Sequence, residues 1–144
     1  MKRIWILVAN QAEAQIYSGM NVPGDLSLVA TLTHEEGAAH KRDLASAAPG
    51  RVHDRMGQAR HSMEPDVGVR EKERRRFAKQ IVTRLQSAHL QGDFDRLVLL
   101  ASPAVLGVIR KMLSGDLSRA VVMEIPKDVV GQGMEEIHRQ LSRS

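Results

Sequence analysis

The stretch DRLVLLASPAVLGVIRKML, residues 95–113, joins two kinds of sequence pattern. From Asp95 to Ser102 apolar residues follow one another, which is typical of a strand covered on both faces. Ser102 and Pro103 then indicate a helix start, because serine can cap the first turn and proline fits the first helical position. A buried strand that leads directly into a helix, here Pro103 to Leu113, indicates an α/β fold.

The N-terminal part of the chain is predicted to supply three more strands. Residues 4–10, IWILVAN, form a second continuous apolar run of strand length. Residues 13–19, EAQIYSG, can pair with that run as a hairpin. Residues 26–34, LSLVATLTH, alternate after the Pro23-Gly24 turn signal. The alternation places four side chains on one side of this third strand: Leu26, Leu28, Ala30 and Leu32.

The C-terminal half is predicted to alternate between helices and strands. A helical stripe of Phe77, Ala78, Ile81, Leu85 and Ala88 predicts a long basic helix from about Val67 to Gln91, with Gly92 as its stop. Residues 117–125 resemble a strand, residues 131–133 (GQG) a turn, and residues 133–141 a terminal helix. The pattern predicts one α/β domain, residues 1–144, with a mixed sheet of about five strands flanked by helices. Residues 4–9 and 97–100 are expected to form interior strands.

Composition excludes several classes of site and protein. The chain has 144 residues and no cysteine, so disulfides, thiolate zinc sites and thiol nucleophiles are absent. Neither of the common glycine-rich nucleotide-binding motifs occurs. No apolar run reaches the length of a signal peptide or a membrane span. We therefore expect a cytoplasmic protein that does not enter membranes and needs no cofactor.

One long segment is polar and shows the periodicity of neither a helix nor a strand. Residues 35–65 exceed the usual length of a connection, and loops this long are usually functional or disordered. We expect residues 38–65 to be the least ordered part. From His40 to Arg76 there are ten Lys or Arg against six Asp or Glu, so this part of the chain is basic. Such a run is often only a solvated surface, but it also suits RNA phosphate.

Histidines gather near the same loop, which raises the question of a metal site. His34, His40, His53 and His61 could together supply imidazole ligands to zinc or a similar ion. Their spacing fixes no geometry, and no His-x-x-x-His pair occurs on a helix. We therefore expect no metal.

The loop and its flanking strands closely resemble a bacterial family, the host attachment proteins, named as proteins required for attachment to host cells. The resemblance covers nearly the whole chain, including WILVANQAEAQIYSG near the start and FDRLVLLASPAVLGVIRKML later. Within the loop it rests on an ordered set of residues: His34, Gly37, His40, Arg42-Asp43-Leu44, Pro49-Gly50-Arg51, Gly57-Gln58, Arg60-His61 and Met63-Glu64-Pro65.

More distantly, this family resembles the central domain of archaeal and eukaryotic class-one peptide release factors, in which a Gly-Gly-Gln loop precedes a long basic helix. The resemblance implies that Gly57 and Gln58 promote hydrolysis of the peptidyl-tRNA ester. A backbone N–H there would act as donor to the developing oxyanion. It also implies RNA contacts by six residues: Arg51, Arg55, Arg60, His61, Arg74 and Arg75. In this chain Met56 occupies the place of the first glycine.

Two hypotheses follow from these patterns. The first is a translation-associated protein that binds the ribosome or tRNA and hydrolyses peptidyl-tRNA or rescues ribosomes. The second is a non-catalytic interaction module with a protein or RNA partner, which is consistent with Met56. The sequence does not indicate an oligomeric state.

Overall fold

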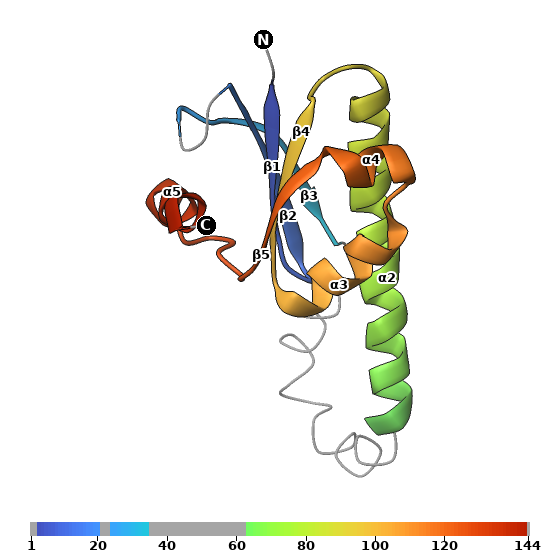
Figure 1. Cartoon of the computed structure of the whole chain (residues 1–144). Coiled ribbons are helices and arrows are strands. Elements are labelled where there is room, and N and C mark those ends of the chain that lie inside the picture. The colour runs from blue at the N-terminus through green and yellow to red at the C-terminus, as the bar shows by residue number, and fades with distance from the viewer. Residues whose placement is uncertain (1–2, 21–23, 35–62, 144) are drawn as a thin grey trace.

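The computed structural model describes residues 3–20, 24–34 and 63–143, with side chains from residue 68 onward in the last range. These residues form five strands and four helices, and Figure 1 shows their arrangement. The elements are β1 (Ile4–Ala9), β2 (Glu13–Gly19), β3 (Ser27–Thr33), α2 (Met63–Leu90), β4 (Arg96–Ala101), α3 (Pro103–Met112), α4 (Gly115–Ala120), β5 (Val121–Pro126) and α5 (Met134–Arg143).

The strands form one mixed sheet in the order β3-β2-β1-β4-β5. The pairs β1–β2 and β2–β3 are antiparallel, whereas β1–β4 and β4–β5 are parallel. Every residue of β1 is buried, as is every residue of β4 after Arg96. Strands covered on both faces need apolar side chains at successive positions, which both runs supply. The predicted α/β fold and the interior placement of the two strands are confirmed.

The two faces of the sheet carry different layers (Figure 1). Trp5, Leu7 and Ala9 belong to a core cluster that includes buried residues of α2, α3 and α4. Ile4, Ile6 and Val8 point the other way, into a smaller cluster that includes residues of α5. One face is therefore covered by three helices, and the other by α5.

The long helix α2 confirms the predicted stripe but begins earlier than expected. All five predicted stripe residues, Phe77 to Ala88, are buried. The helix starts at Met63, before the predicted Val67, because a proline such as Pro65 is tolerated in the first turn, where backbone N–H groups have no intrahelical partner. It ends at Leu90, and Gly92 follows with a φ of +81° that favours glycine.

Residues 117–125 are not one strand, as the sequence suggested. The first part lies in α4, and β5 begins only at Val121. Ser114 starts α4 because its hydroxyl accepts a hydrogen bond from the Leu117 backbone N–H at 3.2 Å. A capped turn therefore precedes the strand, and β-branched valines begin where the helix ends.

The predicted alternation of β3 is also wrong, because the strand contains a bulge. Ile16 pairs with Ala30 and Tyr17 pairs with Leu28, so β2 skips Val29. One extra residue turns the following side chains to the opposite face. Ala30 and Leu32 pack against the cluster under α2, whereas Leu26 packs against the cluster under α5.

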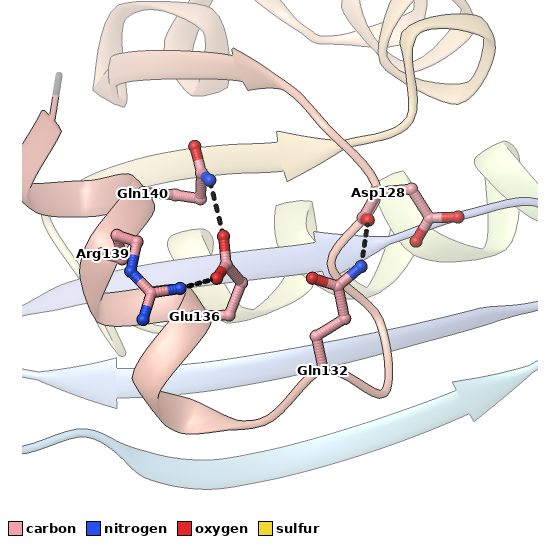
Figure 2. A network of polar contacts seen from close by, with 5 residues as sticks. All are labelled: Asp128, Gln132, Glu136, Arg139 and Gln140. Atoms are coloured by element: carbon pink, nitrogen blue, oxygen red, sulfur yellow. Dashed lines mark hydrogen bonds and ion pairs between the residues drawn. The ribbon is translucent and has the colours of Figure 1, made fainter.

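A polar network holds α5 and the turn that leads to it (Figure 2). The Gln132 Nε2 donates to the Asp128 backbone oxygen at 3.2 Å, and the predicted turn at residues 131–133 is confirmed. Within α5, Glu136 accepts from Gln140 Nε2 at 2.7 Å and forms an ion pair with Arg139. The Gln140 hydrogen bond, followed by the Arg139 charge, lowers the pKa of the Glu136 carboxyl.

Candidate functional site

The structure tests the placement of only two of the predicted site residues, Arg74 and Arg75, which lie on α2. The predicted catalytic pair Gly57 and Gln58 lies outside the described residues. So do the predicted RNA contacts of the loop: Arg51, Arg55, Arg60 and His61. The expectation about order in residues 38–65 concerns mainly the same undescribed segment.

Arg74 and Arg75 are neighbours in sequence but differ in their surroundings. The Arg74 Nη1 lies 3.0 Å from the Glu71 Oε2, and the Arg74 side chain is only 28% exposed. Its Nε is buried without a hydrogen-bond partner among the described residues. Arg75 is exposed. The charge of Arg74 is therefore partly compensated within α2, while that of Arg75 is presented to solvent.

Arg75 belongs to a row of exposed cations that we call the α2 flank: Lys72, Arg75 and Lys79. Residues three and four apart lie on one side of a helix, so the three side chains share a surface. In the described part of the chain no carboxylate forms an ion pair with them. The N-terminal half of α2 extends past the ends of the strands (Figure 1). A partner can therefore approach much of the flank without contacting the sheet.

A groove of about 570 Å³ lies between the end of β3 and α2, and we call it the β3–α2 groove. Its β3 wall is Thr31–His34, and its α2 wall consists of Arg76, Gln80 and Arg84. Thr31 and Thr33 are exposed, as are the three α2 residues. Ala30 and Leu32 pack against the cluster under α2 and His34 stacks on Phe77, so the side chains of Thr31 and Thr33 point to the other face of the sheet. The polar side chains on the α2 wall of the groove are amide and guanidinium groups.

His34 is the buried member of this groove, only 5% exposed. Its ring stacks on Phe77, with ring centroids 5.1 Å apart and an angle of 27° between the planes. The backbone N–H of His34 donates to the Ala12 oxygen at 2.9 Å, which fixes the end of β3. Its Nε2 is buried and has no hydrogen-bond partner among the described residues. A buried polar atom in this state is unusual and requires an explanation.

Sequence reasoning missed Arg76, Gln80 and Arg84 as residues of this groove. The three recur at a spacing of four, which places them along one side of α2. That spacing alone predicts that the three polar side chains share one face of the helix. Their position beside the end of β3 depends on how α2 packs against the sheet, which no local pattern encodes.

The comparison with protein families decides the identity of the chain. The family described as protein required for attachment to host cells matches residues 5–141. The chain belongs to this family. The resemblance predicted from the loop and the strands is therefore confirmed at family level, whereas the similarity to release factors remains a hypothesis.

The chain is also similar to an uncharacterized protein of Rickettsia prowazekii strain Madrid E. The two sequences are 27% identical over 78 residues, which is 53% of this chain and 52% of that protein. The similarity therefore spans about half the length of each, and it transfers no activity to this chain.

The carboxyl end of the parallel strands is a second candidate site, because ligands often bind there in α/β sheets. The Asn10 Oδ1 accepts hydrogen bonds from the backbone N–H groups of Ala12 and Glu13, both at 2.9 Å. The Asn10 Nδ2 donates to the Asp128 carboxylate at 3.2 Å and 3.3 Å. Both side chains are thus engaged in holding the turn after β1 and the segment after β5.

Of the four clustered histidines only His34 lies within the described residues, and it stacks on Phe77. Among those residues no three His, Asp or Glu side chains are grouped so that they could hold a metal ion. In the part of the chain that the structure describes, no helix is long and apolar enough to cross a membrane.

Proposed function

We propose that the protein binds RNA through the exposed cations of the α2 flank. The observation that carries the proposal is the row of Lys72, Arg75 and Lys79, which share one side of α2 and have no carboxylate partner in the described region. Lysine and arginine contacts to phosphate supply most of the sequence-independent affinity for nucleic acid. A single helix that projects past its sheet can follow an RNA backbone (Figure 1).

The dimensions of α2 support this assignment. The helix has 28 residues, which corresponds to about 42 Å at 1.5 Å per residue. The first buried stripe residue is Phe77, so core packing involves mainly the C-terminal half. A helix needs an apolar stripe only where it packs, and it is otherwise free to carry charge. The N-terminal half of α2 is therefore a polar extension that is suited to a partner.

We further propose that the RNA partner is the ribosome or tRNA. This finer proposal rests on the order of the sequence, in which the segment containing Gly57 and Gln58 precedes the basic helix α2. If the loop acts on peptidyl-tRNA, water attacks the ester carbonyl and the tRNA hydroxyl leaves. The backbone N–H at Gln58 would stabilise the oxyanion. If the segment does not act, we attribute the loss to Met56, which occupies the place of the first glycine and lacks the backbone freedom of glycine.

The RNA proposal is tested with a triple variant, Lys72→Gln, Arg75→Gln and Lys79→Gln, and a labelled single-stranded RNA. Three lost phosphate contacts should reduce the slope of log affinity against log salt by about 2. The matched control is Lys127→Gln, Arg139→Gln and Arg143→Gln, which removes the same charge from residues after β5 and on α5. An equal loss of affinity in both triple variants would contradict a local role for α2. Absence of RNA binding by the wild type at 50 mM salt would end the proposal.

The ribosome and hydrolysis proposals need separate measurements. Co-sedimentation with ribosomes at low and moderate salt should occur for the wild type and weaken in the α2 triple variant. Release of labelled peptide from ribosome-bound peptidyl-tRNA is then compared for wild type, Gly57→Val and Met56→Gly. Activity that Gly57→Val reduces by about a hundred- to a thousandfold would support an oxyanion donor in the loop. If all three proteins bind ribosomes and release no peptide, the protein is a non-catalytic interaction module.

A further inference from the structure

The two edge strands of the sheet differ in how they are protected against an added strand. The edge strand β5 contains Pro126 and Glu124, and the Glu124 carboxylate forms an ion pair with Arg110. Proline and charged side chains are among the features by which edge strands avoid pairing. The other edge strand, β3, has the sequence SLVATLT, with neither a charge nor a proline. Within its own sequence β3 therefore lacks the features that block pairing.

The backbone groups that β3 directs away from β2 follow from the hydrogen bonds between the two strands. The His34 backbone N–H donates to the Ala12 oxygen, so every second residue back to the bulge at Val29 also directs its backbone groups toward β2. The N–H and C=O groups of Thr31 and Thr33 therefore point away from β2. Among the described residues they have no backbone partner. An extended chain that lies beside β3 can pair with these four groups.

On the face of the sheet toward α2, this edge borders the β3–α2 groove. Arg84 and Gln80 line the groove and are exposed. In the described part of the chain, Arg84 forms no ion pair. His34 lines the groove as well, and its buried Nε2 lacks a hydrogen-bond partner in the same part of the chain. A side chain that enters the groove from an added strand therefore meets a guanidinium whose charge is not compensated.

On the opposite face, the same edge is uncharged. Leu28 pairs with Tyr17, which belongs to the cluster under α5, so the Leu28 side chain lies on that face, and it is 56% exposed. The side chains of Thr31 and Thr33 point to this face too. An added strand would thus meet a cation on one face and apolar or hydroxyl groups on the other.

We propose that β3 binds an extended acidic segment of a partner protein, which adds a sixth strand to the sheet. The backbone of the segment pairs with Thr31 and Thr33. Every second side chain of the segment points to the α2 face, where a carboxylate can pair with Arg84. This partner is additional to RNA, and its binding does not depend on the α2 flank.

The charge of Arg84 favours an acidic partner over a second copy of the chain. Antiparallel pairing of two β3 strands would place both α2 helices on the same face of the joined sheet, because the two-fold axis is perpendicular to the sheet. Both Arg84 side chains would then lie beside the same junction. Like charges that meet across an interface oppose association.

The binding experiment uses the intact chain and a labelled peptide of eight residues, in which valine or threonine alternates with glutamate. The wild type should bind this peptide with a dissociation constant below about 1 mM. Arg84→Glu should weaken binding at least about tenfold, and it should bind the matched peptide with lysine in place of glutamate more tightly than the wild type does. Lys127→Glu makes the same charge change after β5, at the other edge of the sheet, and should leave both affinities nearly unchanged.

Backbone pairing is tested by N-methylation of the peptide. Successive N–H groups of a strand point to opposite edges, so only one of the two alternating sets of residues donates to β3. In antiparallel pairing the glutamates face α2 and their N–H groups point away from β3. Methylation of the valine and threonine nitrogens should therefore weaken binding at least about tenfold, whereas methylation of the glutamate nitrogens should not. The reverse order would support parallel pairing at the same edge.

Amide hydrogen exchange locates the bound peptide independently of affinity. In the free protein the Thr31 and Thr33 amides should exchange faster than the Leu32 amide, whose N–H is directed toward β2. Saturation with the peptide should slow exchange at Thr31 and Thr33. Binding that leaves these two rates unchanged would place the peptide elsewhere and contradict the proposal.

Other results would also overturn the proposal. They are a wild type that does not bind the acidic peptide, an equal loss of binding in Arg84→Glu and Lys127→Glu, and equal affinities of the two methylated peptides. Sedimentation at several protein concentrations tests the second copy. A wild type that dimerises, with the Thr31 and Thr33 amides protected in the absence of peptide, would assign the β3 edge to self-association instead.

Discussion

At the scale of single residues, Tyr17 provides a direct test of the cluster under α5. It is the only tyrosine of the chain and is 9% exposed. Burial, followed by the nearby Glu13 carboxylate, raises the pKa of its phenol above the ordinary value of 10.0. Because the neutral phenol is favoured in the folded state, this contribution to stability is complete below pH 10 and is lost as pH rises through the folded pKa.

We therefore predict that the midpoint of the tyrosinate absorbance lies at a higher pH in the native protein than after denaturation. In Tyr17→Phe the free energy of unfolding should decrease less steeply with pH in the alkaline range. It should also cost about 0.5–1.5 kcal/mol near neutral pH, since the hydrogen bond from the Tyr17 hydroxyl to the Gln15 Oε1 at 2.9 Å is lost. Native and denatured titrations that coincide would show that this phenol is not buried in solution.

Arg74 and Arg75 allow a second test at the residue scale, because the ion pair with Glu71 separates them. Arg75→Gln should reduce the salt slope of RNA binding by about 0.7, the value for one phosphate contact on a single strand. Arg74→Gln should change the slope less, because its charge is already partly compensated. Slopes measured for both variants check this order, and a larger effect from Arg74 would mean that the ion pair opens when RNA binds.

At the scale of elements, α4 offers a matched pair of serines. Ser114→Ala removes the side-chain acceptor for the Leu117 backbone N–H and should cost about 0.5–2 kcal/mol. Ser118→Ala, an exposed change inside the same helix, should cost little. Urea unfolding followed by fluorescence of Trp5, the only tryptophan, measures both. Equal stabilities for the two variants would show that the cap does not stabilise α4.

Some elements were predictable from sequence and others were not, for physical reasons that differ. β1 and β4 were predictable because strands buried on both faces need a local apolar run. The segment at 117–125 was misassigned because valines at 121 and 122 dominate the pattern, although Ser114 already indicated a helix start. The bulge at Val29 and the β3–α2 groove depend on contacts between distant segments, and no local pattern encodes them.

At the scale of the whole molecule, the unequal cover of the sheet leads to a prediction. Removal of residues 134–144 deletes Ile137 and Leu141, which pack in the cluster with Ile4, Ile6 and Val8. Loss of one such buried side chain costs about 2–5 kcal/mol, and whole domains are stable by only about 5–15 kcal/mol. The shortened chain should therefore unfold or self-associate at room temperature. Sedimentation and binding of a hydrophobic dye measure this.

A chain shortened by residues 142–144 alone is the control and should remain monodisperse if the full chain is. A chain without α5 that keeps the melting temperature of the full chain would show that α5 does not stabilise the sheet. RNA binding by such a folded, shortened chain should be unchanged, since the α2 flank lies on α2.

The pairing of β1 with β4 also has a consequence for the order of events during synthesis. β1 emerges first, but its parallel partner lies far along the chain, with Ile4 beside Arg96. At about 5–20 residues per second, a ribosome needs roughly 5 to 20 s to make the residues between them. For that interval the nascent chain can form the hairpin of β1 and β2, but one edge of its most apolar strand lacks a partner. The interior strand of the finished protein is therefore an exposed edge strand early in its life, when association with other chains is most probable.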